Sequence, residues 1–225
     1  MKILIVDDEE MIRGVIREYV EFEGNEAYEA ADGMEAVKKC RENDYDLVLM
    51  DVMMPHLDGF SAVKEIRKSK DVPVIMLSAR GEEYDKLFAF EIGVDDYVTK
   101  PFSPAELTAR LDALVRRIRG DSVAVSELLT QGPFVMNTRN RTLEKNGNRI
   151  RLTQVEYAIV KLFMQNPGRA LSREEILSVV WGREYEGDLK IVDVNIRRLR
   201  IKLEDNPNLP VFVTTVWGYG YKWGS

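Results

Sequence analysis

The sequence predicts an α/β fold class with two domains: a five-stranded, doubly wound parallel sheet, followed by a smaller α+β domain. Three observations support this prediction. The chain has 225 residues, which suits two domains of roughly 100–120 residues each. Its first half alternates short, continuously apolar runs with stretches of helical periodicity, as a parallel sheet covered by helices requires. Its second half combines short strand-like pieces, three helical stretches and a terminal hairpin.

Five segments of the first half are predicted strands, because each is a short apolar run next to polar or turn residues. They are segments 2–6, 25–30, 46–50, 72–77 and 97–99. Between them, apolar residues recur at helical spacing, for example at Met11, Val15 and Tyr19. Ser103 and Glu106 have the spacing of a capping box, which predicts that the last helix of this half begins at Pro104.

We place the first domain at 1–118, a linker at 119–124 and the second domain at 125–225, because the alternating pattern lapses near Gly120. The second domain opens with strand-like pieces at 134–136, 141–143 and 149–151. Its three helices are expected to follow the capping residues Thr153 (with Glu156), Ser172 (with Glu175) and Asp188. Apolar runs around Gly218 and Gly220 predict the terminal hairpin.

The composition narrows the class of protein. Apolar residues make up 45% of the chain, which is ordinary for a globular protein. The single cysteine, Cys40, excludes an intramolecular disulfide and lies in a predicted helix, where a packing role is expected. The sequence has no apolar run of about 18 residues and begins with a strand pattern rather than a leader peptide. We therefore expect a soluble, cytoplasmic protein.

The charge is distributed unevenly between the two halves. Residues 1–120 contain 17 Lys and Arg against 26 Asp and Glu, a formal charge of −9. Residues 121–225 contain 15 against 12, a formal charge of +3. This asymmetry predicts that a polyanionic partner binds the second half.

Polar side chains follow the predicted strands of the first half. Asp7 and Asp8 follow the first strand, Asp51 the third, Ser78 the fourth and Lys100 the fifth. Ligands of an open parallel sheet bind at the carboxyl ends of its strands. Each residue alone fits an ordinary turn or helix cap, but their joint occurrence at four strand ends predicts a binding site.

The residue types of this site indicate phosphoryl chemistry. Three carboxylates in one cleft repel each other unless a cation lies among them. Carboxylate oxygens without a nearby cluster of His or Cys favour Mg²⁺. Together with the Lys100 ammonium, such an ion would neutralise a phosphoryl group during transfer, and Ser78 could donate a hydrogen bond to its oxygens.

This set resembles the receiver domain of two-component response regulators, over residues 1 to about 118. The resemblance implies that Asp51 accepts a phosphoryl group from a partner histidine kinase. It also implies that Mg²⁺ is bound by Asp8 directly, by Asp7 through water, by Asp51 and by the backbone carbonyl of Met53.

The same resemblance assigns roles on the other side of the phosphoryl group. Ser78 and Tyr97 would form a switch pair, in which the serine hydroxyl binds the phosphate and the tyrosine ring turns inward. Lys100 would pair with the phosphoryl oxygens, and the Lys100–Pro101 peptide would be cis.

Charged residues of the fourth helix, fifth strand and fifth helix resemble those that form intermolecular ion pairs in one large subfamily. They are Lys86, Asp95, Asp96, Glu106 and Arg110. The resemblance implies that the chain forms a homodimer on phosphorylation. Without it, these charges would describe a solvated face, where exposed pairs contribute little.

The stretch from about residue 188 to 204 is a predicted basic helix. One stripe, expected to face the core, consists of Val192, Ile196, Leu199 and Leu203. The opposite side carries Val194 and Ile201, flanked by Lys190, Arg197 and Arg198, with Arg200 and Lys202 nearer the sides. Apolar residues among basic ones suit a major groove, although a plain basic surface helix has the same composition.

The run 192–200 and the order of elements around it resemble the winged helix-turn-helix domain of the OmpR/PhoB subfamily. The resemblance implies binding of promoter DNA by Lys190, Val194, Asn195, Arg197, Arg198, Arg200, Lys202, Thr215 and Trp217. Asn195 stands where many members have His, and Trp217 where some have Arg. In relatives, the loop corresponding to 181–187 contacts RNA polymerase.

These patterns predict a phosphorylation-dependent transcription factor rather than an enzyme. Two alternatives remain. An aspartate-nucleophile phosphatase would need a second Asp two residues after the nucleophile, but Met53 stands there. A phosphorylation-independent DNA-binding protein would use its receiver only for dimerisation, and the complete acidic pocket disfavours it.

Overall fold

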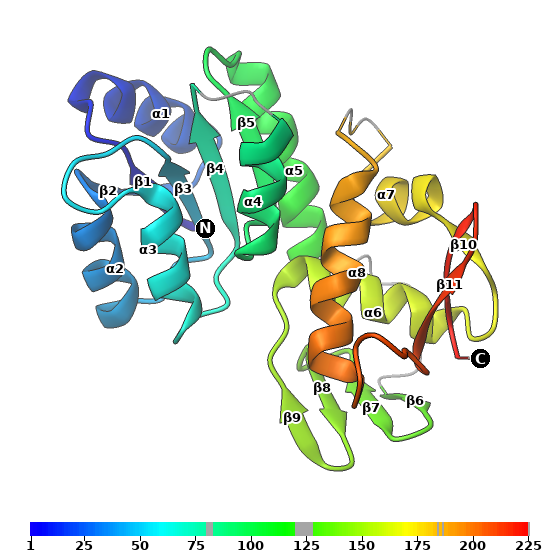
Figure 1. The fold of residues 1–225 in the computed structure, drawn as a ribbon. Helices are drawn as coiled ribbons and strands as arrows, with labels where there is room; N and C mark the ends of the chain where they lie inside the picture. Colours follow the sequence, from blue (N-terminus) through cyan, green and yellow to red (C-terminus); the bar gives the residue numbers. More distant parts are fainter. Residues whose placement is uncertain (80–82, 120–127, 184, 186, 225) are drawn as a thin grey trace. The chain divides into compact units, whose positions relative to one another are not determined.

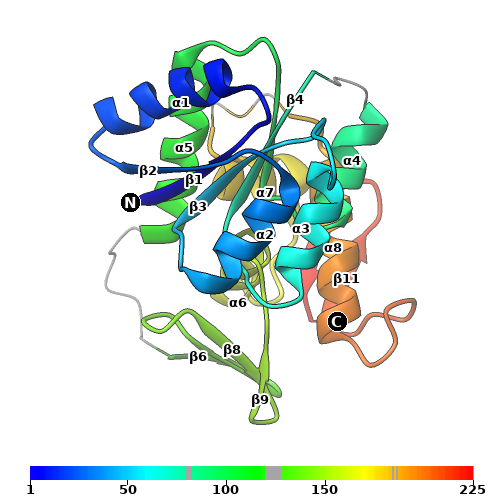
Figure 2. The ribbon, with the colours of Figure 1, turned by 90° about the vertical axis from the view of Figure 1, so that its left-hand side faces the viewer.

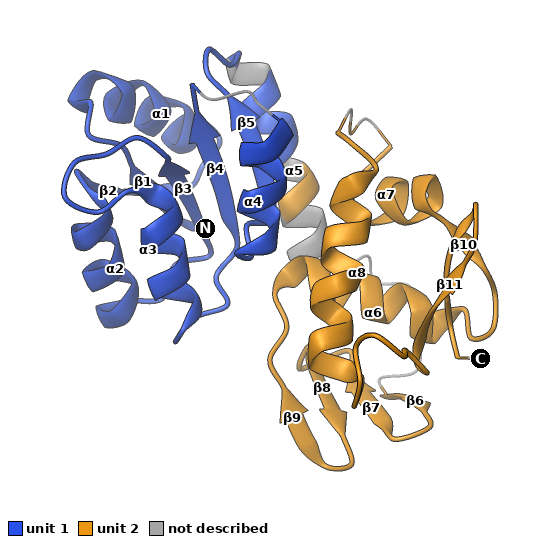
Figure 3. Cartoon of the chain, viewed as in Figure 1, with its two compact units in different colours: residues 1–112 blue, residues 113–225 orange. Residues whose placement is uncertain are grey.

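A computed structural model describes residues 1–79, 83–119, 128–183, 185 and 187–224. The chain divides into two compact units, Met1–Asp112 and Ala113–Ser225 (Figure 3). The division falls within helix α5 (Pro104–Arg119). The linker expected at 119–124 lies outside the described residues except for Arg119. Over the part of the chain that is described, no helix has the length and apolarity needed to span a membrane.

The first unit is a five-stranded parallel sheet in the order β2-β1-β3-β4-β5, which confirms the predicted fold class. Its strands are β1 (Lys2–Val6), β2 (Glu26–Ala30), β3 (Leu47–Asp51), β4 (Val74–Ser78) and β5 (Asp96–Thr99). The helices besides α5 are α1 (Glu10–Phe22), α2 (Gly33–Glu42), α3 (Gly59–Arg67) and α4 (Glu83–Glu91). Figures 1 and 2 show α1 and α5 on one face of the sheet and α2, α3 and α4 on the other.

The central strands are apolar because both faces of the sheet are covered by helices. Every residue of β3 and β4 is buried, as are the last four residues of β1. The chain leaves β1 toward β2 on one side and returns to β3 on the other, so β1 and β3 are neighbours. Their parallel register pairs Val6 with Met50. Asp7 and Asp51 therefore follow at adjacent positions, where such sheets bind ligands.

A glycine is required where α3 begins. The Gly59 N–H donates a hydrogen bond to the Val52 carbonyl at 3.0 Å. A Cβ atom at this position would lie 2.0 Å from the carbonyl oxygen of Asp51. The backbone of α3 therefore packs directly against the backbone that carries Asp51, and any side chain at residue 59 would displace one of them.

Besides the end of α5, the described residues of the second unit form two small antiparallel sheets and three helices, as predicted for an α+β domain. The first sheet consists of β6 (Leu128–Gln131), β7 (Phe134–Asn137), β8 (Thr142–Lys145) and β9 (Asn148–Ile150). The second consists of β10 (Leu171–Ser172), β12 (Gly220–Trp223) and β11 (Val213–Val216). The helices are α6 (Gln154–Gln165), α7 (Arg173–Trp181) and α8 (Lys190–Leu203). The sequence analysis did not predict β6 or β10.

Helix caps confirm two of the three predicted helix starts in this unit. The capping boxes Thr153–Glu156 and Ser172–Glu175 are both complete. The third helix starts later than expected: its N-cap is Leu189, which makes no side-chain cap hydrogen bond. Asp188 instead accepts a hydrogen bond from the backbone N–H of Lys190 at 2.9 Å.

Candidate functional site

The acidic residues at the carboxyl ends of β1 and β3 are joined by one lysine. The Lys100 Nζ atom lies 2.6 Å from Asp7 Oδ2 and 2.6 Å from Asp51 Oδ1. Asp7 is fully buried, Asp51 is 4% exposed and the Lys100 side chain is 18% exposed. The structure thus brings together three residues that lie far apart in the sequence, as their places at strand ends predicted. Two carboxylates share one cation.

Backbone amides orient both carboxylates. Asp51 Oδ2 accepts a hydrogen bond from the Met53 N–H at 2.7 Å, and Asp7 Oδ1 accepts one from the Glu9 N–H at 3.0 Å. Burial raises the pKa of Asp51 above its ordinary value and the charge of Asp7 adds to this, although Lys100 and Met53 oppose it. The carboxylate of Asp51 is therefore held in place but is incompletely neutralised.

For Lys100, burial and the neighbouring charges have opposite effects on the pKa from those at Asp51. Burial alone would lower the pKa of Lys100, but hydrogen bonds and attraction from Asp51 and Asp7 raise it overall. Lys100 thus remains a cation at neutral pH. The peptide between Lys100 and Pro101 is cis, as expected.

Ser78 and Tyr97 lie on the same side of the sheet. Ser78 pairs with Thr99 and Met76 pairs with Tyr97 in the β4–β5 register. Residues two apart on a strand point to one face, so the Ser78 and Tyr97 side chains share a face. Both side chains are buried.

The donor set has the chemistry of a site for a hard divalent cation. Its donors are carboxylates, and two buried carboxylates exceed the charge of one ammonium. Asp8, which follows Asp7, is exposed. Over the described part of the chain, no three acidic, His or Cys side chains converge closely enough to hold a metal ion. Metal binding at this edge would therefore require the Asp8 side chain to turn toward Asp7 and Asp51.

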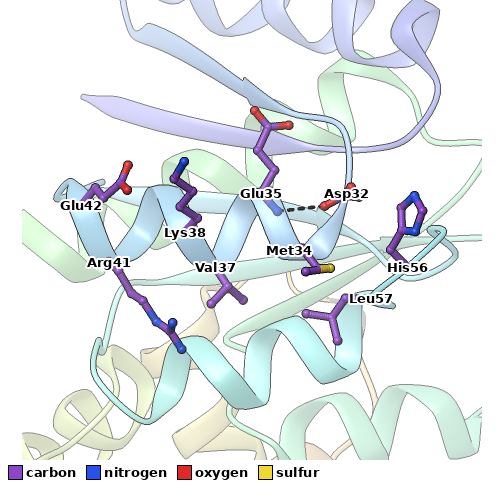
Figure 4. Close-up of a pocket in the computed structure, with 9 residues that line it drawn as sticks. All are labelled: Asp32, Met34, Glu35, Val37, Lys38, Arg41, Glu42, His56 and Leu57. Carbon is purple, nitrogen blue, oxygen red and sulfur yellow. Dashed lines mark hydrogen bonds between the residues drawn. The ribbon is translucent and has the colours of Figure 1, made fainter.

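A separate groove of about 930 Å³ lies between α2 and the loop after β3 (Figure 4). Its apolar part is formed by Met34, Val37 and Leu57. Charged side chains of both signs and His56 surround that part. None of the lining residues belongs to the acidic cluster, so the groove is distinct from the phosphoryl chemistry expected at Asp51.

One residue expected on a dimer face is instead part of the interior. Asp95 is fully buried and accepts hydrogen bonds from Arg67 Nη2 at 3.1 Å and from the Val74 N–H at 2.9 Å. This carboxylate is therefore neutralised within its own unit, by Arg67. The sequence could not show that Arg67, 28 residues earlier, neutralises it.

The other charges of that set make contacts within the chain. Arg110 Nη1 lies 3.6 Å from Asp96 Oδ1, and Arg110 Nη2 lies 3.9 Å from Glu106 Oε1. Asp96 is nearly buried, whereas Lys86 and Glu106 are partly exposed. Asp96 Oδ1 also accepts a hydrogen bond from the backbone N–H of Tyr97 at 2.8 Å.

The basic helix α8 has the two faces that its periodicity predicted. Val192, Ile196, Leu199 and Leu203 are buried. On the outward face, Lys190, Arg197 and Ile201 are exposed and Val194 is half-buried. These four residues recur at spacings of four and three and therefore form one stripe.

Asn195 does not belong to the outward face. Its side chain is buried, and Nδ2 donates a hydrogen bond to the Ile191 carbonyl at 2.9 Å. Asn195, one of the residues expected to contact DNA, therefore lies on the packed side of α8. Its position between Ile191 and Leu199 on the helical wheel, both of which are buried, carried this signal.

Four more of the expected DNA contacts already have partners within the domain. Arg200 Nε donates to the Val213 carbonyl at 2.9 Å and Arg200 Nη2 to Thr215 Oγ1 at 2.8 Å, which joins α8 to the terminal hairpin. Arg198 and Lys202 lie within 3.0 Å and 2.6 Å of the carboxylate of Glu156.

The turn of the terminal hairpin is more open. Trp217 is 92% exposed, and it is the most exposed large apolar side chain among the described residues. The loop expected to meet RNA polymerase, 181–187, includes residues that the structure does not describe.

The fold and both sites define a response regulator with a DNA-binding output domain. Residues 3–112 match the family of response regulator receiver domains, and residues 147–223 match the family described as transcriptional regulatory protein, C terminal. The chain belongs to the OmpR/PhoB type of response regulator transcription factors. Members of this family regulate transcription and are not classical enzymes.

Relatives match almost the whole chain. The probable transcriptional regulator ycf27 of Cyanophora paradoxa is 43% identical over 226 residues, which cover 98% of this chain and 95% of that protein. The uncharacterized transcriptional regulatory protein YclJ of Bacillus subtilis is 40% identical, with 99% and 98% covered. Among solved structures, DrrB of Thermotoga maritima, an OmpR/PhoB homolog, has 30% identity and a TM-score of 0.53, covering 100% of this chain and 99% of that chain.

Proposed function

We propose that Asp51 accepts a phosphoryl group from a histidine kinase and that the phosphorylated chain dimerises and binds promoter DNA. The observation that carries this proposal is the cluster of Asp7, Asp51 and Lys100 at the carboxyl ends of adjacent strands. In the transfer, an oxygen of the Asp51 carboxylate forms a bond to phosphorus, the phosphorus–nitrogen bond of the phosphohistidine breaks, and the leaving imidazole takes up a proton.

The residues around Asp51 support this chemistry. The Met53 N–H and Lys100 orient the carboxylate. Because the Lys100 ammonium is carried by a flexible side chain, it can move from the carboxylate to pair with the phosphoryl oxygens. Ser78 is placed on the same sheet edge to donate its hydroxyl proton to a phosphoryl oxygen. A Mg²⁺ ion held by Asp7, Asp8, Asp51 and the Met53 carbonyl would neutralise the remaining charge.

Labelling with a small phosphodonor tests the assignment. Incubation with Mg²⁺ and acetyl phosphate should add one acid-labile phosphate, measured by intact mass, and Asp51→Asn should abolish it. Asp58→Asn is the matched control, because it makes the same substitution at an exposed helix cap outside the acidic cluster. Labelling that persists in the Asp51 variant would exclude Asp51 as the acceptor.

An exposed apolar stripe on α1 supports a protein partner next to this site. Met11, Val15, Tyr19 and Phe22 recur at helical spacing and are all exposed, Met11 at 82% and Phe22 at 86%. Arg13 ties the first turn of α1 to the acidic cluster, since its Nη1 donates to the carbonyls of Asp7 and Asp8 at 2.8 and 3.2 Å. The kinase domain that presents the phosphohistidine would dock here.

A comparison of phosphotransfer from a kinase with labelling by acetyl phosphate distinguishes a docking defect from a defect in the reaction itself. Val15→Glu should slow transfer from a histidine kinase that phosphorylates the wild-type chain, while labelling by acetyl phosphate stays unchanged. Leu209→Glu, on an exposed apolar residue of the second unit, should alter neither rate. Equal transfer to the Val15 variant and the wild type would place the docking surface elsewhere.

The DNA-binding surface we propose is the outward stripe of α8 together with the hairpin turn. Lys190, Arg197 and Val194 would meet the major groove, and Trp217 the adjacent minor groove. We assign a structural role to four other residues, because their contacts within the domain hold α8 and the hairpin in place: Arg198, Arg200, Lys202 and Thr215. Any contact that they make with the DNA backbone would be made while they keep these partners.

Dimerisation and contact with RNA polymerase complete the proposal. Lys86, Asp96, Glu106 and Arg110 would form ion pairs with a second copy of the chain. The phosphate would bias this pairing only if it binds Ser78 and Tyr97 differently in the two states. RNA polymerase would meet the loop at 181–187.

A further inference from the structure

A buried carboxylate joins the start of α6 to the DNA-binding helix α8. We propose that Glu156 is a positioning residue for DNA recognition: it orients Arg198 and fixes the rotational setting of α8, so that the outward stripe of α8 faces the major groove. This inference rests on the proposed DNA-binding role of α8, and it concerns a residue that itself touches no DNA.

The contacts of Glu156 reach three parts of the domain. Its Oε2 accepts hydrogen bonds from the Thr153 N–H at 2.8 Å and from Lys202 Nζ at 2.6 Å. Its Oε1 lies 3.0 Å from Arg198 Nη2. Lys202 also donates to the Arg151 carbonyl at 3.0 Å. One carboxylate therefore fastens α8 to both the first turn of α6 and the segment before it.

These contacts exceed what a helix cap requires. Glu175 occupies the same position in the capping box of α7, and its carboxylate is partly exposed and pairs with Arg169 rather than with α8. Glu156 is fully buried, where an ionised carboxylate is unfavourable unless cations compensate for it. The capping role does not explain why the Glu156 carboxylate is buried. The ion pairs with two cations of α8 do explain it, because they compensate for the buried charge.

The two cations restrain a motion that the apolar contacts of α8 leave open. Burial of Val192, Ile196 and Leu199 is favourable in many similar orientations, because the hydrophobic effect has no direction. Ion pairs and hydrogen bonds have preferred distances and angles. Arg198 and Lys202 are one turn apart, so anchoring both fixes the rotation of α8 about its axis as well as its position along that axis.

The two contacts differ in kind. Lys202 makes a hydrogen bond, whereas Arg198 makes an ion pair in which, among the described residues, Oε1 accepts no hydrogen bond. The Arg198 side chain remains 15% exposed at the edge of the outward stripe. Glu156 therefore holds the guanidinium by charge while leaving it at the border of the DNA-binding surface.

DNA discrimination is the measurement that separates positioning from plain stability. The probes are a duplex selected from a random-sequence library by the phosphorylated wild-type chain and a scrambled duplex of the same composition. Glu156→Gln keeps an oxygen for the Thr153 N–H and removes the charge. We expect the ratio of the two affinities to fall about tenfold, as when one base contact is lost. Glu175→Gln, the matched capping-box control, should leave the ratio unchanged.

A double-mutant cycle shows whether Glu156 acts through Arg198. In an Arg198→Met background, Glu156→Gln should change the ratio by less than about twofold, because the side chain it orients is gone. A tenfold loss that persists in that background would overturn the proposal, and so would an unchanged ratio in the single variant.

Two further outcomes are distinguishable. If Glu156→Gln does not fold, Lys202→Met makes the same test, with an expected loss of about two- to threefold in the ratio; an unchanged ratio there would also overturn the proposal. If the wild-type chain itself yields no selected duplex, the proposed DNA-binding function fails, and the failure is seen before any variant is compared.

Discussion

Two clusters of buried charge, one in each unit, have opposite balances. In the first unit, the carboxylates of Asp7 and Asp51 share the single cation Lys100. In the second, among the residues that the structure describes, the carboxylate of Glu156 lies against two cations, Arg198 and Lys202. Distances to the cations are similar, between 2.6 and 3.0 Å, so the clusters differ in stoichiometry rather than in closeness.

The ratio of carboxylates to cations distinguishes a reactive site in the first unit from a structural ion-pair cluster in the second. An excess of buried negative charge is unfavourable until a metal ion or a proton arrives, so the first cluster is incomplete by itself. An acid with two cations is compensated, so the second cluster is complete. Removing one cation should therefore have unequal consequences in the two units.

The largest expected effect follows from removing the lysine of the first cluster. Lys100→Met leaves Asp7 and Asp51 without a cation and should lower the free energy of unfolding of the first unit by about 1–3 kcal/mol in EDTA. Mg²⁺ should recover part of this loss. Hydrogen exchange of β1 and β3 amides measures it, because all three tryptophans, Trp181, Trp217 and Trp223, lie in the second unit.

Lys68→Met is the control for that experiment. Lys68 forms an exposed pair with Glu65 on the same unit, and its loss should change stability by less than about 0.5 kcal/mol. Equal losses of unfolding free energy in the two variants would mean that the cluster carries no excess negative charge. So would a Lys100 variant whose stability does not change when Mg²⁺ is added.

Removing one cation from the second cluster should have a smaller effect. Lys202→Met leaves Glu156 paired with Arg198, so the free energy of unfolding of the second unit should fall by only about 1 kcal/mol. Tryptophan fluorescence during denaturation reports this unit. A loss as large as that of Lys100→Met would show that Arg198 alone does not compensate Glu156 and would remove the contrast between the clusters.

The salt dependence of DNA binding should distinguish structural from DNA-contacting cations. Lys190→Met should reduce the slope of log K against log salt concentration by about 0.9, the contribution of one phosphate contact. Lys202→Met should leave the slope unchanged, since its ammonium is bound to Glu156. A reduced slope in the Lys202 variant would assign that lysine to the phosphate backbone.

The smallest expected effect is on the pH dependence of stability, which should change in opposite directions when Asp51 and Asp58 are replaced by asparagine. The pKa of Asp51 is raised by burial, so ionising it opposes folding, and this penalty grows as pH rises from the unfolded-state pKa to the folded-state pKa. Asp51→Asn should therefore be more stable than the wild type at pH 7, and the gap should close as pH falls toward the ordinary pKa of an aspartate. Denaturation of both proteins across this range measures it.

Asp58 supplies the opposite case. Although burial alone would raise its pKa, hydrogen bonds from Ser61 and Phe60 lower it overall, so its ionised form favours folding. Asp58→Asn should be less stable than the wild type at pH 7, and this gap too should close in acid, where Asp58 itself becomes protonated. Gaps of the same sign in the two variants would contradict the environments described for these carboxylates.

The first unit was the more predictable from sequence. Its strands are short and apolar, and their ends carry Asp7, Asp51 and Lys100, so topology alone places these residues together. The second unit contains strands that sequence patterns do not distinguish from loops. β6 is four residues long with no fully buried position, and β10 has only two residues.

Tertiary packing also decides which site residues are buried. Asp95 was placed in the dimer set by resemblance to a subfamily, and its burial against Arg67 depends on a contact with a different helix. Asn195 was placed among the DNA contacts by resemblance to relatives, and it lies on the packed side of α8. Glu156 was recognised as a helix cap, but its link to α8 depends on tertiary packing that no local pattern contains.

The close approach of Gly59 to the backbone of Asp51 has a consequence for genetics. No side chain fits there, since a Cβ would meet the Asp51 carbonyl at 2.0 Å. A screen for alleles that have lost the response but still accumulate full-length protein should recover substitutions at codon 59. Suppressor mutations that restore signalling should fall in the neighbouring loop rather than in the DNA-binding unit.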